Sequence, residues 1–293
     1  MRIAFIGAVE FSRRTLELLI EMKQDVVAVC TLKESPFNAD HCDLGQICQK
    51  NNIPWSYIPD INSRESIRWL VDKKPDVIFC FGWSRLLGKK ILNLAPLGVV
   101  GFHPAALPAN RGRHPLIWAL VLGLKETAST FFFMDEGADS GDILSQQKIE
   151  VSDEDDAATL YEKVTICAME QIKVFVPQLS SGSAPRTVQD NKLANVWRKR
   201  CKADGQIDWR MSANSIHNLV RGLAKPYVGA HFLYQEKEIK VWKTAVVDDV
   251  LRNAEPGKVV AVKNGKAIVR CGECAIKLLI IEPELDLSCE EYL

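Results

Sequence analysis

The sequence lacks the phosphate-binding signatures of the common cofactor folds. Its opening segment, MRIAFIGAVEF, contains a single glycine, Gly7, where dinucleotide-binding folds need the pattern G-x-G-x-x-G. The chain also has no G-x-x-x-x-G-K-[ST] loop and no G-x-S-x-G nucleophile elbow. We therefore expect neither NAD nor FAD as the cofactor, and no nucleophilic serine.

Metal-binding and membrane-spanning patterns are also lacking. Nine cysteines occur at irregular positions, and the one close pair, Cys271 and Cys274, has no second pair or nearby histidine to complete a zinc site. Free thiols in a reducing compartment are the simpler interpretation, so we expect no metal site. Without a secretory segment or an apolar run of membrane length, the chain is expected to be cytoplasmic, with no membrane partner.

An excess of charge of either sign is missing too. The 37 Lys and Arg residues balance 37 Asp and Glu residues. Proteins that bind nucleic acid usually carry a basic excess, so this balance counts mildly against such a partner. The length of 293 residues suits roughly two domains of ~150 residues each.

What is present is a regular alternation of strand-like and helix-like segments. Strands are predicted at 2–7, 26–32, 53–58, 76–81 and 98–103, with helices at 11–23, 42–52, 63–74 and 84–95 between them. A helix at 115–124, strands at 128–135 and 142–151, and a long helix from about 153 to 177 follow. This α/β order predicts a doubly wound, mostly parallel, Rossmann-like sheet.

The C-terminal part has a different pattern. Residues 212–224 read as one helix, and the strands that follow include an Asn-Gly hairpin signal at 264–265. We therefore predict a catalytic domain at 1–182, a polar linker at 183–203 and a smaller OB-like β-barrel domain at 204–293.

Titratable residues follow two of the predicted strands. His103 ends the strand GVVGFH, and the loop MDEGADSGD places Asp135, Glu136, Asp139 and Asp142 after another strand. Ligands of open α/β sheets bind beyond the carboxyl ends of the strands. An imidazole that faces a carboxylate can move a proton and polarise a carbonyl. Taken singly, a capped core histidine and a solvated acidic turn explain these residues more simply.

Two of these segments resemble a known family. The segment HPAALPANRGRHP resembles the H-x-S-x-L-P-x-x-R-G loop of enzymes that transfer a formyl group from N10-formyltetrahydrofolate, and MDEGADSGDIL resembles their D-x-G-x-D-x-G-x-I/L segment. The opening residues and DGQIDWRMSANSIHNLVRGLAKPYVGAHF resemble methionyl-tRNA formyltransferases. The resemblance covers nearly the whole chain.

The resemblance implies a direct attack by a substrate amine on the formyl carbon. His103 would polarise the formyl oxygen, and Asp139 would hold the histidine's protonation state and help to remove the amine proton. N10-formyltetrahydrofolate would be the co-substrate. Its pocket would be lined by Trp83, Leu86 and Leu87 on one side and Asp135 and Gly137 on the other. The acceptor side would be shaped by Leu107, Pro108, Asn110 and Arg111.

One position departs from the family pattern. The family motif is Asn-x-His, and the asparagine amide binds the formyl oxygen, but Gly101 stands at that position here. Loss of one oxyanion donor typically costs ~10²–10³ in rate. Three alternatives follow: a water or Asn110 replaces the amide, the acceptor or acyl group differs, or the protein is a pseudoenzyme that binds folate or nucleotide. The intact His103 and Asp139 favour an active enzyme.

The acceptor is the remaining question. Relatives by resemblance formylate methionyl-tRNA, amino sugars on nucleotide carriers, or glycinamide ribonucleotide. From Asp204 onward the chain has 12 Lys and Arg against 13 Asp and Glu, whereas a domain that binds tRNA phosphates should be basic. We therefore expect an amino sugar nucleotide as acceptor, with methionyl-tRNA as the alternative. A homodimer is left open.

Overall fold

The computed structural model describes residues 1–35, 39–248 and 253–293. The chain packs into two compact units, of which the first comprises 1–112, 128–149 and 163–196 and the second 113–127, 150–162 and 197–293. The second unit therefore includes two stretches that precede the expected linker. The boundaries at 182 and 203 follow chain order alone and stay a prediction.

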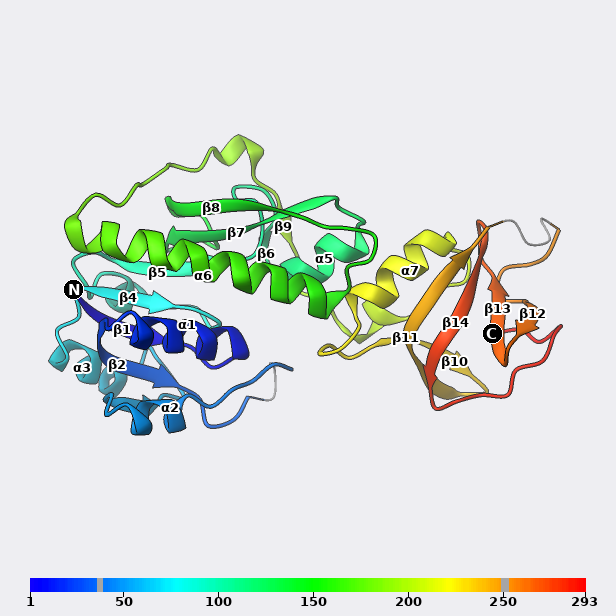
Figure 1. Cartoon of the computed structure of the whole chain (residues 1–293), viewed down its shortest axis with the longest axis horizontal. Coiled ribbons are helices and arrows are strands. Elements are labelled where there is room, and N and C mark those ends of the chain that lie inside the picture. The colour runs from blue at the N-terminus through cyan, green and yellow to red at the C-terminus, as the bar shows by residue number, and fades with distance from the viewer. Residues whose placement is uncertain (36–38, 249–252) are drawn as a thin grey trace. The chain divides into compact units, whose positions relative to one another are not determined.

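The first unit contains a seven-stranded mixed sheet (Figure 1). Its strands are β1 (Arg2–Ile6), β2 (Asp25–Thr31), β3 (Trp55–Tyr57), β4 (Val77–Cys80), β5 (Val99–His103), β7 (Glu126–Phe133) and β8 (Ile143–Glu150). Their order is β3-β2-β1-β4-β5-β7-β8, and the first five strands in this order pair in parallel. β7 runs antiparallel to β5. The predicted Rossmann-like, mostly parallel sheet is confirmed.

Helices cover both faces of this sheet. On one face lie α1 (Glu10–Glu21) and α6 (Ala157–Ser181), both drawn in front of the sheet in Figure 1. Phe11 of α1 stacks on Phe102 with ring centroids 4.2 Å apart, and Phe175 of α6 lies 4.7 Å from Phe131. These aromatic contacts place phenylalanine side chains of β5 and β7 beneath the two helices.

The opposite face packs against short helices. They are α2 (Gly45–Lys50), α3 (Arg64–Asp72) and α4 (Lys89–Leu92). Leu70 of α3 and Ile91 of α4 join Ile6 and Ile78 of the sheet in one apolar cluster. Ser63 caps the start of α3, because its hydroxyl accepts a hydrogen bond from the Ser66 N–H at 3.1 Å.

The second unit holds a separate five-stranded sheet. It comprises β10 (Ala230–Tyr234), β11 (Lys237–Val247), β12 (Val259–Lys263), β13 (Lys266–Arg270) and β14 (Ala275–Glu282), beside α5 (Pro115–Val121) and α7 (Ala213–Gly222). The order is β10-β11-β14-β13-β12, and neighbouring strands are antiparallel. Asn264 and Gly265 have φ angles of 54° and 68°, as the predicted two-residue hairpin turn requires.

One predicted helix was wrong in extent. The helix predicted at 84–95 is limited to the single turn of α4, because the preceding loop is held by hydrogen bonds with Asn62 instead. The segment predicted as a linker has short elements of its own. It contains η1 (Asn191–Leu193), β9 (Val196–Trp197) and η2 (Lys202–Gly205), and β9 pairs with β6 (Arg111–Gly112).

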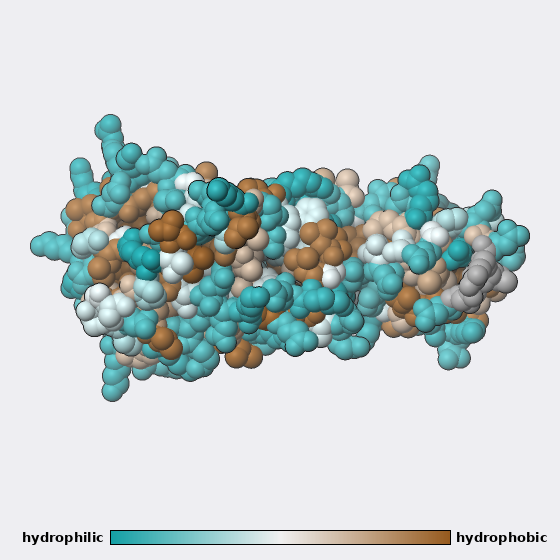
Figure 2. Space-filling model, turned by 90° about the horizontal axis from the view of Figure 1, so that it is seen from above, coloured by the Kyte–Doolittle hydropathy of each residue, from teal (hydrophilic) through white to brown (hydrophobic). Residues whose placement is uncertain are grey.

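The surface gives no sign of a membrane segment within the described residues. None of the helices that the structure describes is both long and apolar enough to cross a membrane. On the face drawn in Figure 2, hydrophobic atoms form separate patches among hydrophilic ones. Scattered apolar side chains of this kind are normal for a protein surface.

The thiols differ sharply in burial, and we expect them to differ in reactivity. Burial raises the pKa of Cys48, Cys80 and Cys271 to about 12, whereas Cys201 and Cys289 are exposed. Since the thiolate is the reactive form, a disulfide reagent at neutral pH should label Cys201 and Cys289 first. Peptide mass mapping with and without denaturant checks this, and rapid labelling of native Cys80 would contradict the described packing.

Candidate active site

His103 lies at the end of β5, where the sheet presents the carboxyl ends of its parallel strands. Pairing with β4 on one side and β7 on the other fixes its backbone. The side chain is 6% exposed, and its Nε2 lies 2.8 Å from the carbonyl oxygen of Asn110. Because a carbonyl oxygen only accepts, Nε2 carries a proton and donates this hydrogen bond.

Asp139 faces the other ring nitrogen of the histidine. Its Oδ2 lies 3.6 Å from Nδ1 of His103 and accepts a hydrogen bond from the Gly112 N–H at 2.9 Å. With Nε2 protonated, a second proton on Nδ1 makes an imidazolium that pairs with the carboxylate. The structure thus brings together the two residues predicted to be catalytic, in an arrangement suited to holding or passing a proton at Nδ1.

Two residues of the expected acceptor loop are committed to internal contacts. Leu107 is 2% exposed, and Arg111 is 8% exposed. The Arg111 guanidinium donates to Gln189 Oε1 at 2.7 Å and to Asn191 Oδ1 at 2.9 Å. Leu107 and Arg111 therefore anchor this loop, and the prediction that the loop shapes the acceptor side remains to be tested.

Pro108 and Asn110 are the more accessible members of the same loop, since both are partly exposed. Asn110 reaches His103 through its backbone carbonyl. Its backbone N–H donates to Asn195 Oδ1 at 2.7 Å. These contacts use only the backbone of Asn110, so the expected use of its side-chain amide as an oxyanion donor stays a prediction.

The expected donor pocket is built partly from the loop after β4. Leu87 is buried, and Trp83 packs against the same apolar cluster, whereas the Leu86 side chain is 82% exposed. Asn62, which the sequence did not single out, fixes this loop. Its amide donates to the Leu86 carbonyl at 3.0 Å and accepts from the Gly88 N–H at 2.6 Å.

The other wall comes from the loop that carries Asp139. Asp135 Oδ1 accepts hydrogen bonds from the Gly137 N–H at 2.9 Å and from the Ser140 hydroxyl at 2.7 Å, which folds the loop into a turn. Lys89 Nζ lies 2.9 Å from Glu136 Oε1, and this carboxylate raises the pKa of Lys89. The ion pair connects the two loops that were predicted to line the pocket.

The space left by the missing family asparagine is filled by a methionine. A Cβ built on Gly101 would lie 2.8 Å from Cγ and 3.1 Å from Sδ of Met134, and 3.1 Å from Phe132 Cε1. Real Cβ atoms essentially never come within 3.0 Å of another heavy atom. A thioether is at most a weak acceptor and has no N–H, so Met134 occupies this space without replacing the amide donor.

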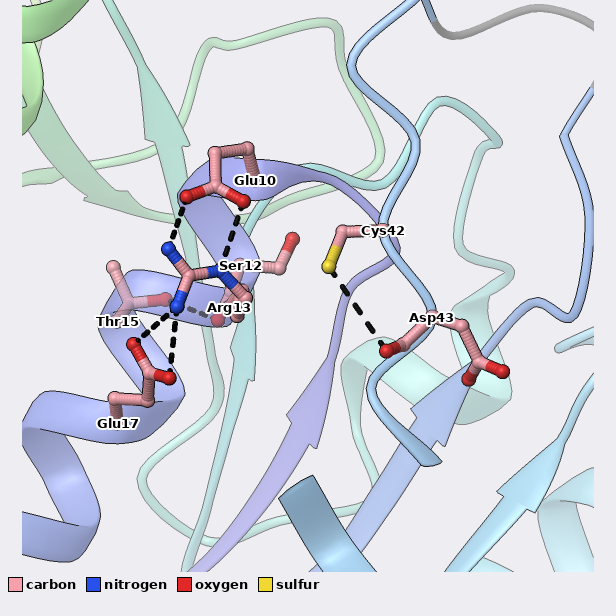
Figure 3. Close-up of polar contacts among 7 residues, drawn as sticks. All are labelled: Glu10, Ser12, Arg13, Thr15, Glu17, Cys42 and Asp43. Atoms are coloured by element: carbon pink, nitrogen blue, oxygen red, sulfur yellow. Dashed lines mark hydrogen bonds and ion pairs between the residues drawn. The ribbon is translucent and has the colours of Figure 1, made fainter. Parts of the chain in front are cut away.

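The turn between β1 and α1, where dinucleotide folds bind phosphate, carries carboxylates (Figure 3). The Arg13 guanidinium donates to Glu10 and to Glu17, each at 2.8 Å, and this pairing lowers the pKa of Glu10. The Ser12 hydroxyl donates to the Phe81 carbonyl instead of facing outward. The Glu10 carboxylate lies at the start of α1, and its pairing with Arg13 occupies the nearby guanidinium, which makes this turn poorly suited to a phosphate.

The expected linker supplies residues that sequence reasoning missed. Gln189 contacts the backbone of Asp139 and the side chain of Arg111, and Asn195 contacts the backbone of Asn110. Neither residue lies in a periodic or motif-like segment, so no sequence signal pointed to them. Among the residues that the structure describes, no group of three or more His, Cys, Asp or Glu side chains could hold a metal ion.

Comparisons with known proteins show which family the chain resembles over most of its length. The chain matches a family model described as formyl transferase over residues 1–175 and a second, formyl transferase C-terminal domain, over residues 200–290. The methionyl-tRNA formyltransferase of Acetivibrio thermocellus is 30% identical over 299 residues, covering 100% of this chain and 96% of its own. The enzyme of that name from Caldanaerobacter subterraneus subsp. tengcongensis is 32% identical over 300 residues, with the same coverage.

A solved structure shares the fold at lower identity. WlaRD, a sugar 3N-formyl transferase solved in the presence of dTDP and 5-N-formyl-THF, superposes with a TM-score of 0.73 at 16% identity. The match covers 97% of this chain and 99% of that one. The mixed sheet and the separate C-terminal sheet are thus a known combination.

The crowding at Gly101 predicts a coupled effect of two substitutions. Gly101→Asn should lower the free energy of unfolding by about 1–3 kcal/mol and slow turnover, because the new side chain overpacks against Met134. Adding Met134→Ala should restore part of this loss, so the double variant is more stable than the sum of the single changes. Denaturant unfolding measures this coupling.

Gly182→Asn is the matched control, since nothing lies within 4 Å of a Cβ there and asparagine tolerates the φ of +73°. Strict additivity of Gly101→Asn and Met134→Ala would contradict a steric contact between the two side chains.

Proposed function

Because this chain belongs to the formyl transferase family, we propose that it transfers a formyl group from N10-formyltetrahydrofolate to the amine of methionyl-tRNA. The observation that carries the chemistry is the buried His103 with Asp139 Oδ2 at 3.6 Å, at the carboxyl end of β5. The choice of acceptor is supported by whole-length identities of 30% and 32% to methionyl-tRNA formyltransferases.

The residues of the expected donor pocket fit a flat, partly polar ring. Trp83, Leu87 and Met134 belong to or pack against one apolar cluster, which gives such a ring apolar cover. The Trp83 Nε1 is buried and has no hydrogen-bond partner within the described residues. A buried donor of this kind is costly unless something accepts from it, and a pterin heteroatom is a suitable acceptor. When bound, the folate supplies an activated formyl group to the amine.

The protein's own part in the reaction is placement and proton transfer. The Asn110 carbonyl holds the proton on Nε2, so proton exchange at His103 occurs through Nδ1, which faces Asp139. A positively charged imidazole beside the reacting carbonyl stabilises the negative charge that develops on its oxygen. The Gly112 N–H keeps Asp139 Oδ2 oriented toward the ring.

A second acceptor is favoured by a different observation. Residues from Asp204 onward carry 12 basic against 13 acidic residues, and tRNA affinity depends on Lys and Arg that displace counterions from phosphates. A nucleotide-linked amino sugar needs far fewer phosphate contacts. This charge balance, together with the fold shared with WlaRD, supports an amino sugar nucleotide as the alternative acceptor.

A direct competition between acceptors tests the proposal. The protein is incubated with N10-formyltetrahydrofolate and either charged initiator methionyl-tRNA or a panel of amino sugar nucleotides, and products are analysed by mass spectrometry. We expect a formyl group on the methionyl amine, at a rate that falls as salt increases. If only a sugar amine is formylated, the amino sugar nucleotide is the acceptor and the proposal of methionyl-tRNA is wrong. If folate binds but no formyl group is transferred, the protein binds folate without this activity.

Substitution of the paired residues tests the mechanism. His103→Ala or Asp139→Asn should lower kcat by about 10²–10⁴, the usual contribution of a positioned acid–base group. Asp72→Asn makes the same chemical change on the exposed surface of α3 and should leave the rate unchanged. Near-normal turnover of both site variants would remove the catalytic assignment.

A further inference from the structure

One segment of the chain touches both loops that carry the paired residues. We define this strap as residues 187–195, within the first compact unit. It begins where Thr187 pairs with Ile143 of β8, through two backbone hydrogen bonds of 2.8 and 2.9 Å. The strap thus starts from a fixed point on the sheet and then passes the catalytic loops.

Gln189 is the central contact of the strap. Its side chain is buried, the residue being 6% exposed. Its Nε2 donates to the carbonyl of Asp139 at 2.9 Å and to the carbonyl of Gly141 at 2.6 Å. Its Oε1 accepts two hydrogen bonds from Arg111, at 2.7 and 3.2 Å. These contacts use both donors and both lone pairs of the amide, so only glutamine suits this position.

Asn195 makes the corresponding contact at the far end of the strap. Its Oδ1 accepts from the Asn110 N–H at 2.7 Å, and its carbonyl accepts from the Arg111 N–H at 3.0 Å. The Asn110 carbonyl, which shares a peptide group with the Arg111 N–H, accepts the hydrogen bond from His103 Nε2. The strap therefore contacts the backbone beside His103 as well as the backbone of Asp139.

The backbone turns sharply at both places. Asn110 and Asp139 have φ angles of 65° and 54°, in the left-handed region that Asn and Asp adopt more readily than other residues with a Cβ. Contacts from neighbouring segments help to fix such a conformation. Gln189 and Asn195 supply contacts of that sort at these two residues.

We propose that Gln189 is a positioning residue, which sets the distance between His103 and Asp139 by tethering the Asp139 backbone to the loop anchored by Arg111. The inference rests on the proposed formyl transfer at this same site. A tether of this kind acts on the chemical step, because a displacement of about 1 Å in a reacting group can cost 10²-fold in rate. Its contacts are to the carbonyls of Asp139 and Gly141, not to Asp135 or Gly137, the two residues of this loop predicted to line the donor pocket.

Two substitutions separate the hydrogen bonds that Gln189 donates from those that it accepts. Gln189→Met removes all of them with a side chain of similar size. Gln189→Glu keeps an acceptor for Arg111 but loses the donor to Asp139 and Gly141. We expect each to lower kcat by about 10²-fold while KM for N10-formyltetrahydrofolate stays within about twofold. Gln147→Met makes the same change on the exposed side of β8 and should leave both constants unchanged.

The outcomes distinguish this inference from the proposed function. If the wild-type protein formylates no acceptor, the proposed function fails before Gln189 is tested. If the wild type is active and Gln189→Glu is nearly as fast, Gln189 acts only as the anchor of Arg111 and the tether is refuted. A parallel rise in KM and fall in kcat would also overturn it, because that pattern indicates a loosened pocket. Circular dichroism confirms folding, and should Gln189→Met not fold, Gln189→Glu decides.

Discussion

The hydrogen bond from His103 Nε2 to the Asn110 carbonyl is the constraint on which the site depends. It fixes the ring orientation of a buried histidine and assigns one proton to Nε2. In the proposed mechanism, proton exchange is thereby confined to Nδ1, which faces Oδ2 of Asp139 at 3.6 Å. That bond holds only while Asn110 keeps its left-handed backbone, and this conformation is supported from the strap by Asn195.

Much of the fold and half of this arrangement follow from the sequence. The alternation of apolar strand-like segments and helix-like segments predicts the Rossmann-like sheet. The spacing of apolar residues along each segment indicates which side chains are buried. The sequence also places His103 and the loop with Asp139 after two predicted strands. β7 runs antiparallel to β5, so the approach of Asp139 to His103 depends on how the loop after β7 folds and does not follow from strand order alone.

The remainder could not be predicted, for a physical reason. Gln189 meets Arg111 across 78 positions of the chain and Gly141 across 48, inside a polar segment with no periodicity. Side-chain hydrogen bonds of this range leave no mark on local composition, and a polar stretch between two domains resembles a solvated linker. Met134 likewise fills the space beside Gly101 because β5 pairs with β7. Neither residue type predicts this contact on its own.

The exchange of an amide donor for a thioether changes what the rest of the site must do. A missing oxyanion donor corresponds to about 2.7–4 kcal/mol of transition-state stabilisation. Met134 supplies apolar cover in that space, and an apolar surrounding strengthens electrostatic interactions. A site that relies on His103 and Asp139, whose Nδ1 and Oδ2 atoms lie 3.6 Å apart, depends strongly on how these two residues are held. The saturated contacts of Gln189 and the backbone contact of Asn195 therefore carry a larger share of the function here than they would beside a second donor.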